Sequence, residues 1–237
     1  RGTEVESVPV DGTPCTFRTC YDVEVAPIAI DNVTIDLPMA ADAQLRITLK
    51  AAGKVGLGQL NLRRVRFFLA DENVRAATLY LWLRRYGRHV ELRNPATQRS
   101  VRLGIKSIQA VGFADNEAIL PYPDHSFPGY RLLQEYFTCP TKFAFFDVAG
   151  LERAAELGIT DKLEIVVPFS RRPEDSLRVS NDSLRLFCTP IVNLFAHSAD
   201  GIRVDHTRTQ YRIRPSTSGR PPEHYEVYTL DRVVGLV

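Results

Sequence analysis

The stretch Phe127–Phe146, FPGYRLLQEYFTCPTKFAFF, combines a helix signal, a helix breaker and a strand signal, and the rest of the chain is organised around it. Pro128 fixes φ for the first turn of a helix, and Ser126 before it is a suitable N-cap for the free amide groups there. Cys139-Pro140 ends the helix, because proline lacks the amide hydrogen that a helix interior needs. The aromatic and β-branched side chains over positions 143–148 then favour a half-buried strand.

The helix in this stretch has one apolar and one polar face. Apolar residues at helical spacing predict a face buried against the chain itself. These residues are Leu132, Leu133, Tyr136 and Phe137. The polar residues, which we expect to face away, are Arg131, Gln134 and Glu135. We therefore predict a docking helix between two halves of the chain.

The alternative is that the apolar face of this helix awaits another subunit. Tyrosine and arginine are enriched at protein interfaces, so this helix supplies candidate subunit or interdomain contacts. They are Tyr130, Arg131, Glu135, Tyr136 and Phe137. Under the docking hypothesis Phe137→Ala costs about 3 to 5 kcal/mol of stability. Under the interface hypothesis it leaves stability almost unchanged and abolishes assembly.

Length and composition bound the class of protein. A chain of 237 residues with 44% hydrophobic residues is sufficient for two compact units with their own cores. The 30 basic and 28 acidic side chains nearly cancel, so no global field attracts nucleic acid or an anionic membrane. No run approaches the ~20 apolar residues of a membrane span, and we expect no membrane insertion.

The chain has four cysteines, and their spacing does not suggest a metal site. There is no CxxC pair and no histidine at zinc-ligand spacing beside them. Free thiols that act as small apolar side chains are the simplest interpretation, and they fit a reducing cytoplasm. We predict neither a metal site nor a bound cofactor.

The alternation of apolar and polar residues predicts a mainly β fold with a few short helices, in two tandem β-sandwich- or barrel-like units of similar plan. We place the first domain at residues 1–118 and the second at residues 119–237, because the segment 115–126 is polar, proline-containing and aperiodic. The second half repeats the first at an offset close to 119. Leu45-Arg46-Ile47 matches Leu163-Glu164-Ile165, and Val65-Arg66-Phe67-Phe68 matches Leu184-Arg185-Leu186-Phe187.

The densest basic segment lies between Arg84 and Arg102 and contains Glu91 as its only acidic residue. One hypothesis is a nucleic-acid-binding β-rich module that grips phosphates with this segment. However, the aromatic residues that an RNA-binding sheet presents beside its arginines are absent. We therefore favour two other roles for Arg84, Arg85 and Arg88: they either contact an acidic protein surface or lie at a solvated helix end. We expect no bound nucleic acid.

Two short segments invite a hydrolase hypothesis, Asp205-His206-Thr207 and Asp124-His125-Ser126. A serine or threonine nucleophile needs a histidine base that is itself held by a carboxylate. There is no GxSxG elbow, and neighbouring residues on a strand point to opposite faces. We therefore predict no catalytic residue.

Several motifs resemble one known family, in the same order. They are FRTCYDVEVAPI from Phe17, LRITL from Leu45, VRFFL from Val65, GYRLLQEYF from Gly129 with Pro140 and Lys142, CTPIVNLF from Cys188, and HYEVYTLDRV from His224. Together they resemble the middle region of TssF, also called ImpG or VasA, the baseplate subunit of bacterial type VI secretion systems. The resemblance covers nearly the whole chain.

The resemblance implies a noncatalytic structural subunit of a contractile injection system. It implies a fragment of the cytoplasmic baseplate wedge, docked at the inner face of the cell envelope, that scaffolds sheath and spike assembly. The partners it implies are a TssG-like subunit, a second TssF-like chain, TssK- and TssE-like subunits, and the spike at the baseplate centre. It implies no cofactor.

Overall fold

The computed structural model describes most of the chain, namely residues 1–10, 12–53, 55–123, 125–159, 161–173, 177–217 and 221–235. These residues form two compact units. The smaller unit combines Arg1–Cys20 with Ile191–Val237, and the larger unit is Tyr21–Pro190.

The smaller unit contains a short antiparallel sheet in the order β1-β2-β12. Its strands are β1 (Glu4–Glu6), β2 (Thr16–Thr19) and β12 (Ile191–Val192). The Asn193 side-chain amide donates to the Thr16 carbonyl oxygen at 2.6 Å and so fastens the end of β12 to β2. A single 3-10 turn, Pro222–His224, follows later in this unit.

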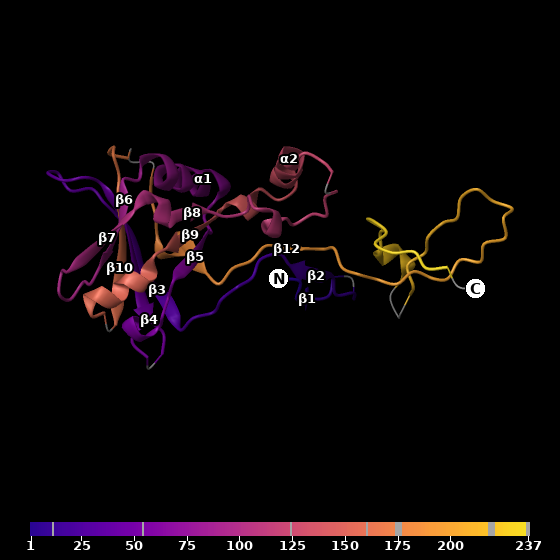
Figure 1. Ribbon diagram of the computed structural model, residues 1–237, viewed down its shortest axis with the longest axis horizontal. Coiled ribbons are helices and arrows are strands. Elements are labelled where there is room, and N and C mark those ends of the chain that lie inside the picture. The colour runs from indigo at the N-terminus through magenta and orange to yellow at the C-terminus, as the bar shows by residue number, and fades with distance from the viewer. Residues whose placement is uncertain are drawn as a thin grey trace. The chain divides into compact units, whose positions relative to one another are not determined.

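The larger unit is built on a five-stranded antiparallel sheet in the order β3-β4-β10-β6-β7 (Figure 1). Its strands are β3 (Ile28–Asp36), β4 (Gln44–Ala51), β10 (Lys162–Pro168), β6 (His89–Arg93) and β7 (Ser100–Gly104). All residues of the central strand β10 except Lys162 are buried, and β10 pairs with β4 along one edge and with β6 along the other. The β-branched side chains in LEIVV suit this position.

A four-stranded antiparallel sheet in the order β11-β5-β9-β8 completes the larger unit. Its strands are β11 (Leu184–Leu186), β5 (Arg64–Leu69), β9 (Phe145–Ala149) and β8 (Ile108–Ala110). The rings of Phe67 on β5 and Phe146 on β9 stack with their centroids 5.3 Å apart. Buried side chains of both sheets belong to one continuous hydrophobic core.

Helices are few and short. α1 (Asn73–Leu81) continues into a π-helical turn, Trp82–Tyr86, and buries Ala76, Leu79 and Leu83. α2 (Pro128–Thr138) is the second α-helix. Single 3-10 segments occupy Leu57–Gln59, Ile105–Ser107, Asp115–Glu117, Pro140–Phe143, Leu151–Leu157 and Asn181–Ser183. The prediction of a mainly β fold with a few short helices is confirmed.

Two features of the predicted arrangement differ from the structure. The described strands do not close into a barrel. The expected boundary between residues 118 and 119 lies inside the larger unit, because β10 pairs with β4 and β6, and β9 pairs with β5. Both large sheets therefore combine strands from the predicted domains 1–118 and 119–237. Among the described residues, no helix is long and apolar enough to cross a membrane.

Candidate interaction surface on helix α2

Helix α2 begins at Pro128 as its sequence predicts, although Phe127 rather than Ser126 occupies the N-cap position. No side chain caps its first turn. The helix ends before Pro140, which opens the 3-10 turn Pro140–Phe143 that leads to β9. Pro140 therefore ends α2 only a few residues before the core strand β9.

The orientation of α2 is the reverse of the prediction. Arg131 is 4% exposed and Glu135 is fully buried, whereas Leu133 and Phe137 are 55% and 77% exposed. Leu132 is half-buried. The expectation that Leu132, Leu133 and Phe137 are buried while Arg131 and Glu135 face solvent is therefore wrong. Ion pairs and hydrogen bonds compensate the charges that face inward.

Glu135 is the centre of this buried polar network. Its Oε1 accepts hydrogen bonds from the backbone amides of Ile119 and Leu120, at 2.8 and 3.2 Å. Its Oε2 forms an ion pair with the Lys142 ammonium group. Both side chains of this pair are 0% exposed. The carboxylate thus ties α2 to the chain segment before it and to the turn after it.

The ammonium group of Lys142 has two hydrogen-bond acceptors although its side chain is fully buried. Its Nζ also donates to the Glu117 carbonyl oxygen at 3.1 Å, and the backbone carbonyl oxygen of Lys142 accepts a hydrogen bond from the Tyr21 hydroxyl at 3.0 Å. Burial lowers the pKa of Lys142, and the hydrogen bond from Nζ to Glu135 opposes this effect. Removing the Glu135 carboxylate would leave the buried Lys142 ammonium group without its counter-ion.

Arg131 holds the first turns of α2 to the segment 113–115. Its guanidinium donates to the Asp115 carboxylate at 3.0 Å and to the carbonyl oxygens of Phe113 and Ala114 at 3.4 and 3.3 Å. The Glu135 carboxylate lies 4.0 Å from the same guanidinium, in an i, i+4 pair. The two charged residues of α2 therefore support each other inside the protein.

Glu117 connects this network to the four-stranded sheet. Its carboxylate accepts a hydrogen bond from the Gly112 amide at 2.7 Å and lies 3.6 Å from Arg66. Arg66 on β5 in turn binds Asp147 on β9 through two hydrogen bonds of 2.7 and 2.9 Å. Through Glu117, Arg66 and Asp147 the anchorage of α2 thus reaches the core strands.

Gly112 beside this network has φ +99°, and a Cβ there would lie 2.8 Å from the Lys142 carbonyl oxygen, so glycine is required.

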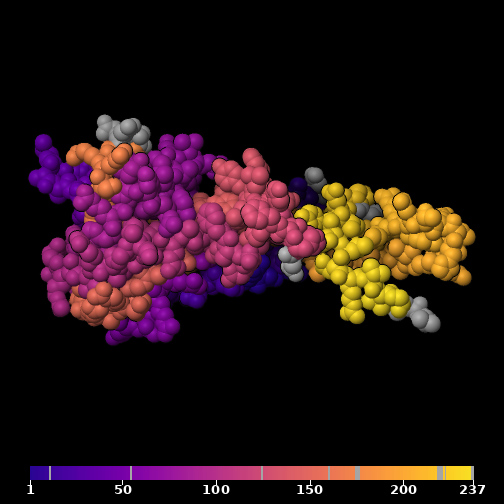
Figure 2. Space-filling view, turned by 45° about the horizontal axis from the view of Figure 1, so that its top comes forward, coloured from indigo at the N-terminus to yellow at the C-terminus, as the bar shows by residue number. Residues whose placement is uncertain are grey.

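The inward charges leave α2 with an apolar outer surface, which we call the α2 face. It consists of Phe127, Tyr130, Leu133, Tyr136 and Phe137, all more than half exposed. Edge-to-face contacts join Phe127 with Tyr130 and Tyr136 with Phe137, at centroid distances of 5.9 and 5.7 Å. In Figure 2 the pink segment that contains α2 lies at the surface of the larger unit. A contiguous group of exposed apolar side chains is a candidate interaction surface.

The basic residues singled out in the sequence lie elsewhere, at the end of the π-helical turn and before β6. Arg84 donates to the Ile108 carbonyl oxygen at 2.6 Å, and Arg88 pairs with Asp42 at 3.3 Å. Arg85 is exposed. Two of the three candidate arginines therefore have partners within the chain, and no hydrogen bond or ion pair connects them with α2 in the described residues.

In the segment Asp205-His206-Thr207, the carboxylate that a hydrolase would use to orient the histidine accepts hydrogen bonds from other groups. Asp205 accepts hydrogen bonds from the Thr207 amide and hydroxyl and from the Tyr211 hydroxyl, which hold its pKa below the ordinary value. These hydrogen bonds come from Thr207 and Tyr211 rather than from His206. Asp124 lies outside the described residues. Within the described ranges, no three His, Cys, Asp or Glu side chains gather in a metal-binding group.

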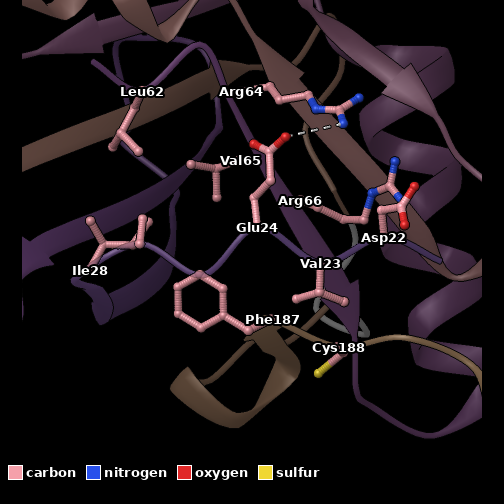
Figure 3. A pocket seen from close by; sticks show the side chains of 11 residues that line it. Asp22, Val23, Glu24, Ile28, Leu62, Arg64, Val65, Arg66, Phe187 and Cys188 are labelled. Atoms are coloured by element: carbon pink, nitrogen blue, oxygen red, sulfur yellow. Dashed lines mark ion pairs between the residues drawn. The ribbon is translucent and has the colours of Figure 1, made fainter. Parts of the chain in front are cut away.

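A pocket in the larger unit lies between the segment 22–28, strand β5 and Phe187-Cys188 (Figure 3). Arg64 at its rim lies 4.0 Å from Glu24 and 3.6 Å from Asp147. Its wall combines these charged groups with Val23, Val65 and other apolar side chains. The pocket borders Arg66, whose guanidinium binds the Asp147 carboxylate.

Comparisons with known proteins agree on one family. The sequence model described as "Type VI secretion system, TssF" matches residues 1–237. The chain is 31% identical to the type VI secretion system component TssF1 of Pseudomonas aeruginosa PAO1, over 96% of this chain and 38% of that protein.

A solved structure, a type VI secretion system TssK-TssF-TssG baseplate subcomplex determined by cryo-electron microscopy, contains a chain with the same fold. The TM-score is 0.77 at 30% identity, over 90% of this chain and 41% of that chain. The chain thus spans about two fifths of the length of the relatives it matches. The resemblance seen in the sequence motifs is confirmed, and the chain belongs to the type VI secretion system TssF family.

Proposed function

We propose that this chain is part of a noncatalytic structural subunit of a type VI secretion baseplate. The family match over residues 1–237 and the fold shared with a chain of a TssK-TssF-TssG baseplate subcomplex support this proposal. Because the chain spans about 38% of TssF1, the proposal concerns a segment of a longer protein.

The partners in this proposal fall into two groups. TssG-like and TssK-like subunits come first, because the structural relative belongs to a subcomplex with those names. A second TssF-like chain, a TssE-like subunit and the spike at the baseplate centre follow from the wedge architecture that the sequence resemblance implies. The cytoplasmic side of the cell envelope is the location that fits such an assembly.

The observation that carries a scaffolding role is the α2 face. A scaffold must hold its contact surfaces in place before the partner arrives, because ordering them on binding would weaken the complex. α2 meets this requirement, since Glu135 and Arg131 fasten it to the chain through buried ion pairs while its aromatic side chains stay outside.

Co-purification tests the proposal directly. The full-length protein that carries this chain is co-expressed with the TssG-like and TssK-like subunits of the same bacterium and passed over a size-exclusion column. We expect all three to elute in one peak. Elution of the protein alone, or stoichiometric labelling of it by a serine-reactive hydrolase probe, would contradict the proposal.

A further inference from the structure

We propose that the α2 face is the docking site for an amphipathic helix of a neighbouring baseplate subunit, and that this helix presents an uncharged, aliphatic stripe. The inference rests on the proposed function and specifies the chemistry of one contact within it. Its evidence is the charge, the spacing, the hydroxyl groups and the area of the α2 face.

The charge of α2 decides what its partner can present. Between Phe127 and Thr141 the sequence contains two charged side chains, Arg131 and Glu135, and both are buried within the chain. A partner charge placed on this surface would lose its hydration without gaining a counter-ion. The contacting surface of the partner is therefore uncharged.

The spacing along α2 favours a helix as the partner. Tyr130, Leu133 and Phe137 follow one another at intervals of three and four residues, which places them in one stripe along the helix. Such a stripe over the ~16 Å of an 11-residue helix is the seam that a second helix covers. A partner strand would instead need free backbone amide and carbonyl groups to pair with, and those of α2 are hydrogen-bonded within the helix.

Two hydroxyl groups set the polarity at the edge of this seam. Within the described part of the chain, neither the Tyr130 nor the Tyr136 hydroxyl has a hydrogen-bond partner. Each needs one when it leaves solvent. The docking helix therefore carries polar side chains beside its aliphatic stripe, which makes it amphipathic rather than apolar all round.

The area of the face argues against a second copy of this chain as the partner. Five aromatic or leucine side chains, each more than half exposed, supply on the order of 600 Å² when fully covered. A stable complex buries about 800 Å² on each partner, so two α2 faces alone would form a marginal dimer. A different subunit can add contacts around the helix.

Co-purification with altered faces tests the inference. Phe137→Glu and Leu133→Glu each place a charge on the α2 face without touching the buried network, and Val74→Glu places the same charge on the 77% exposed Val74 of α1. Each variant of the full-length protein is co-expressed with the TssG-like and TssK-like subunits. Its complex is washed at about 0.1 M and at about 1 M NaCl, which shortens the Debye length from about 10 to about 3 Å.

We expect the unaltered protein and Val74→Glu to keep their partners at both salt concentrations. Phe137→Glu and Leu133→Glu should lose affinity by about tenfold or more while their thermal melting stays unchanged. Retention of partners by both face variants would overturn the inference and leave the proposed function standing. The inference would also be overturned if the complex dissociated at about 1 M NaCl. Self-association of the purified protein that Phe137→Glu abolishes would overturn it too. If the unaltered protein binds neither subunit, both the proposed function and the inference fail.

Discussion

Glu135→Gln is the sharpest test of the buried network. The substitution keeps the side-chain oxygen that accepts from the Ile119 and Leu120 amides, and it removes the charge that faces Lys142. Lys142 is 0% exposed and would retain only the Glu117 carbonyl oxygen. Leaving one member of a buried ion pair without its partner costs about 3 to 5 kcal/mol. This is a large part of the ~5 to 15 kcal/mol that stabilises a typical domain.

Two control variants isolate the effect of burial. Lys142→Met removes the other member of the pair, yet Glu135 keeps both backbone amides and the Arg131 guanidinium 4.0 Å away, so we expect a smaller loss of about 1 to 3 kcal/mol. Glu156→Gln removes a carboxylate from the exposed pair with Arg153 and should change stability little. Urea unfolding followed by tryptophan fluorescence measures all three. A loss in Glu135→Gln no larger than in Glu156→Gln would refute the argument.

Four further predictions follow from the structure. Phe137→Ala should change the free energy of unfolding by no more than about 0.5 kcal/mol, because the ring is exposed. A loss of several kcal/mol would show that the Phe137 ring is buried in the core. Burial raises the pKa of Asp36, but hydrogen bonds from Gln44 and Arg46 outweigh this and hold it below the ordinary value. The stabilisation is then present above about pH 4 and lost as pH falls through the lower folded-state pKa, so Asp36→Asn should reduce the difference between urea midpoints at about pH 5 and about pH 3; an equal difference would contradict this. All four cysteines should react with a thiol reagent in unreduced, denatured protein, whereas fewer than four reacting thiols would indicate a disulfide. Duplex DNA should bind no tighter than the nonspecific range of about 10⁻⁴ to 10⁻⁶ M at physiological salt, and submicromolar affinity would restore a nucleic-acid role for the segment 84–102.

The strands of the core could be predicted from the sequence because they depend on local patterns. The alternation at Leu45, Ile47 and Leu49 corresponds to β4, where these three side chains are buried. The same holds for Val65 and Phe67 on β5. Alternation with a period of two specifies which face of a strand is buried without reference to its neighbours. Pairing partners are not local, and they are the part that the sequence analysis missed.

The orientation of α2 could not be predicted because its cause lies outside the helix. Arg131 and Glu135 form an i, i+4 pair of opposite charge, a pattern that is typical of solvent-exposed helix surfaces. Their burial depends on Lys142 beyond the proline and on backbone amides at Ile119 and Leu120, which no periodicity connects with α2. The four aromatic residues within the short stretch 127–137, with Phe143 soon after them, are the one sequence signal of an interface. That signal also fits a core helix.

The repeated segments have a different physical meaning from the one that their spacing suggests. Ile47 and Ile165 occupy matching positions in the two halves, and in the structure they are direct partners in the β4–β10 ladder. Phe67 and Leu186 likewise match and pair, between β5 and β11. Adjacent antiparallel strands in one core need similar alternation, so the likeness reflects neighbouring places in the same sheets. Separating the halves at residue 118 would leave β4 and β6 without β10 between them, and would expose strand edges that the intact chain covers.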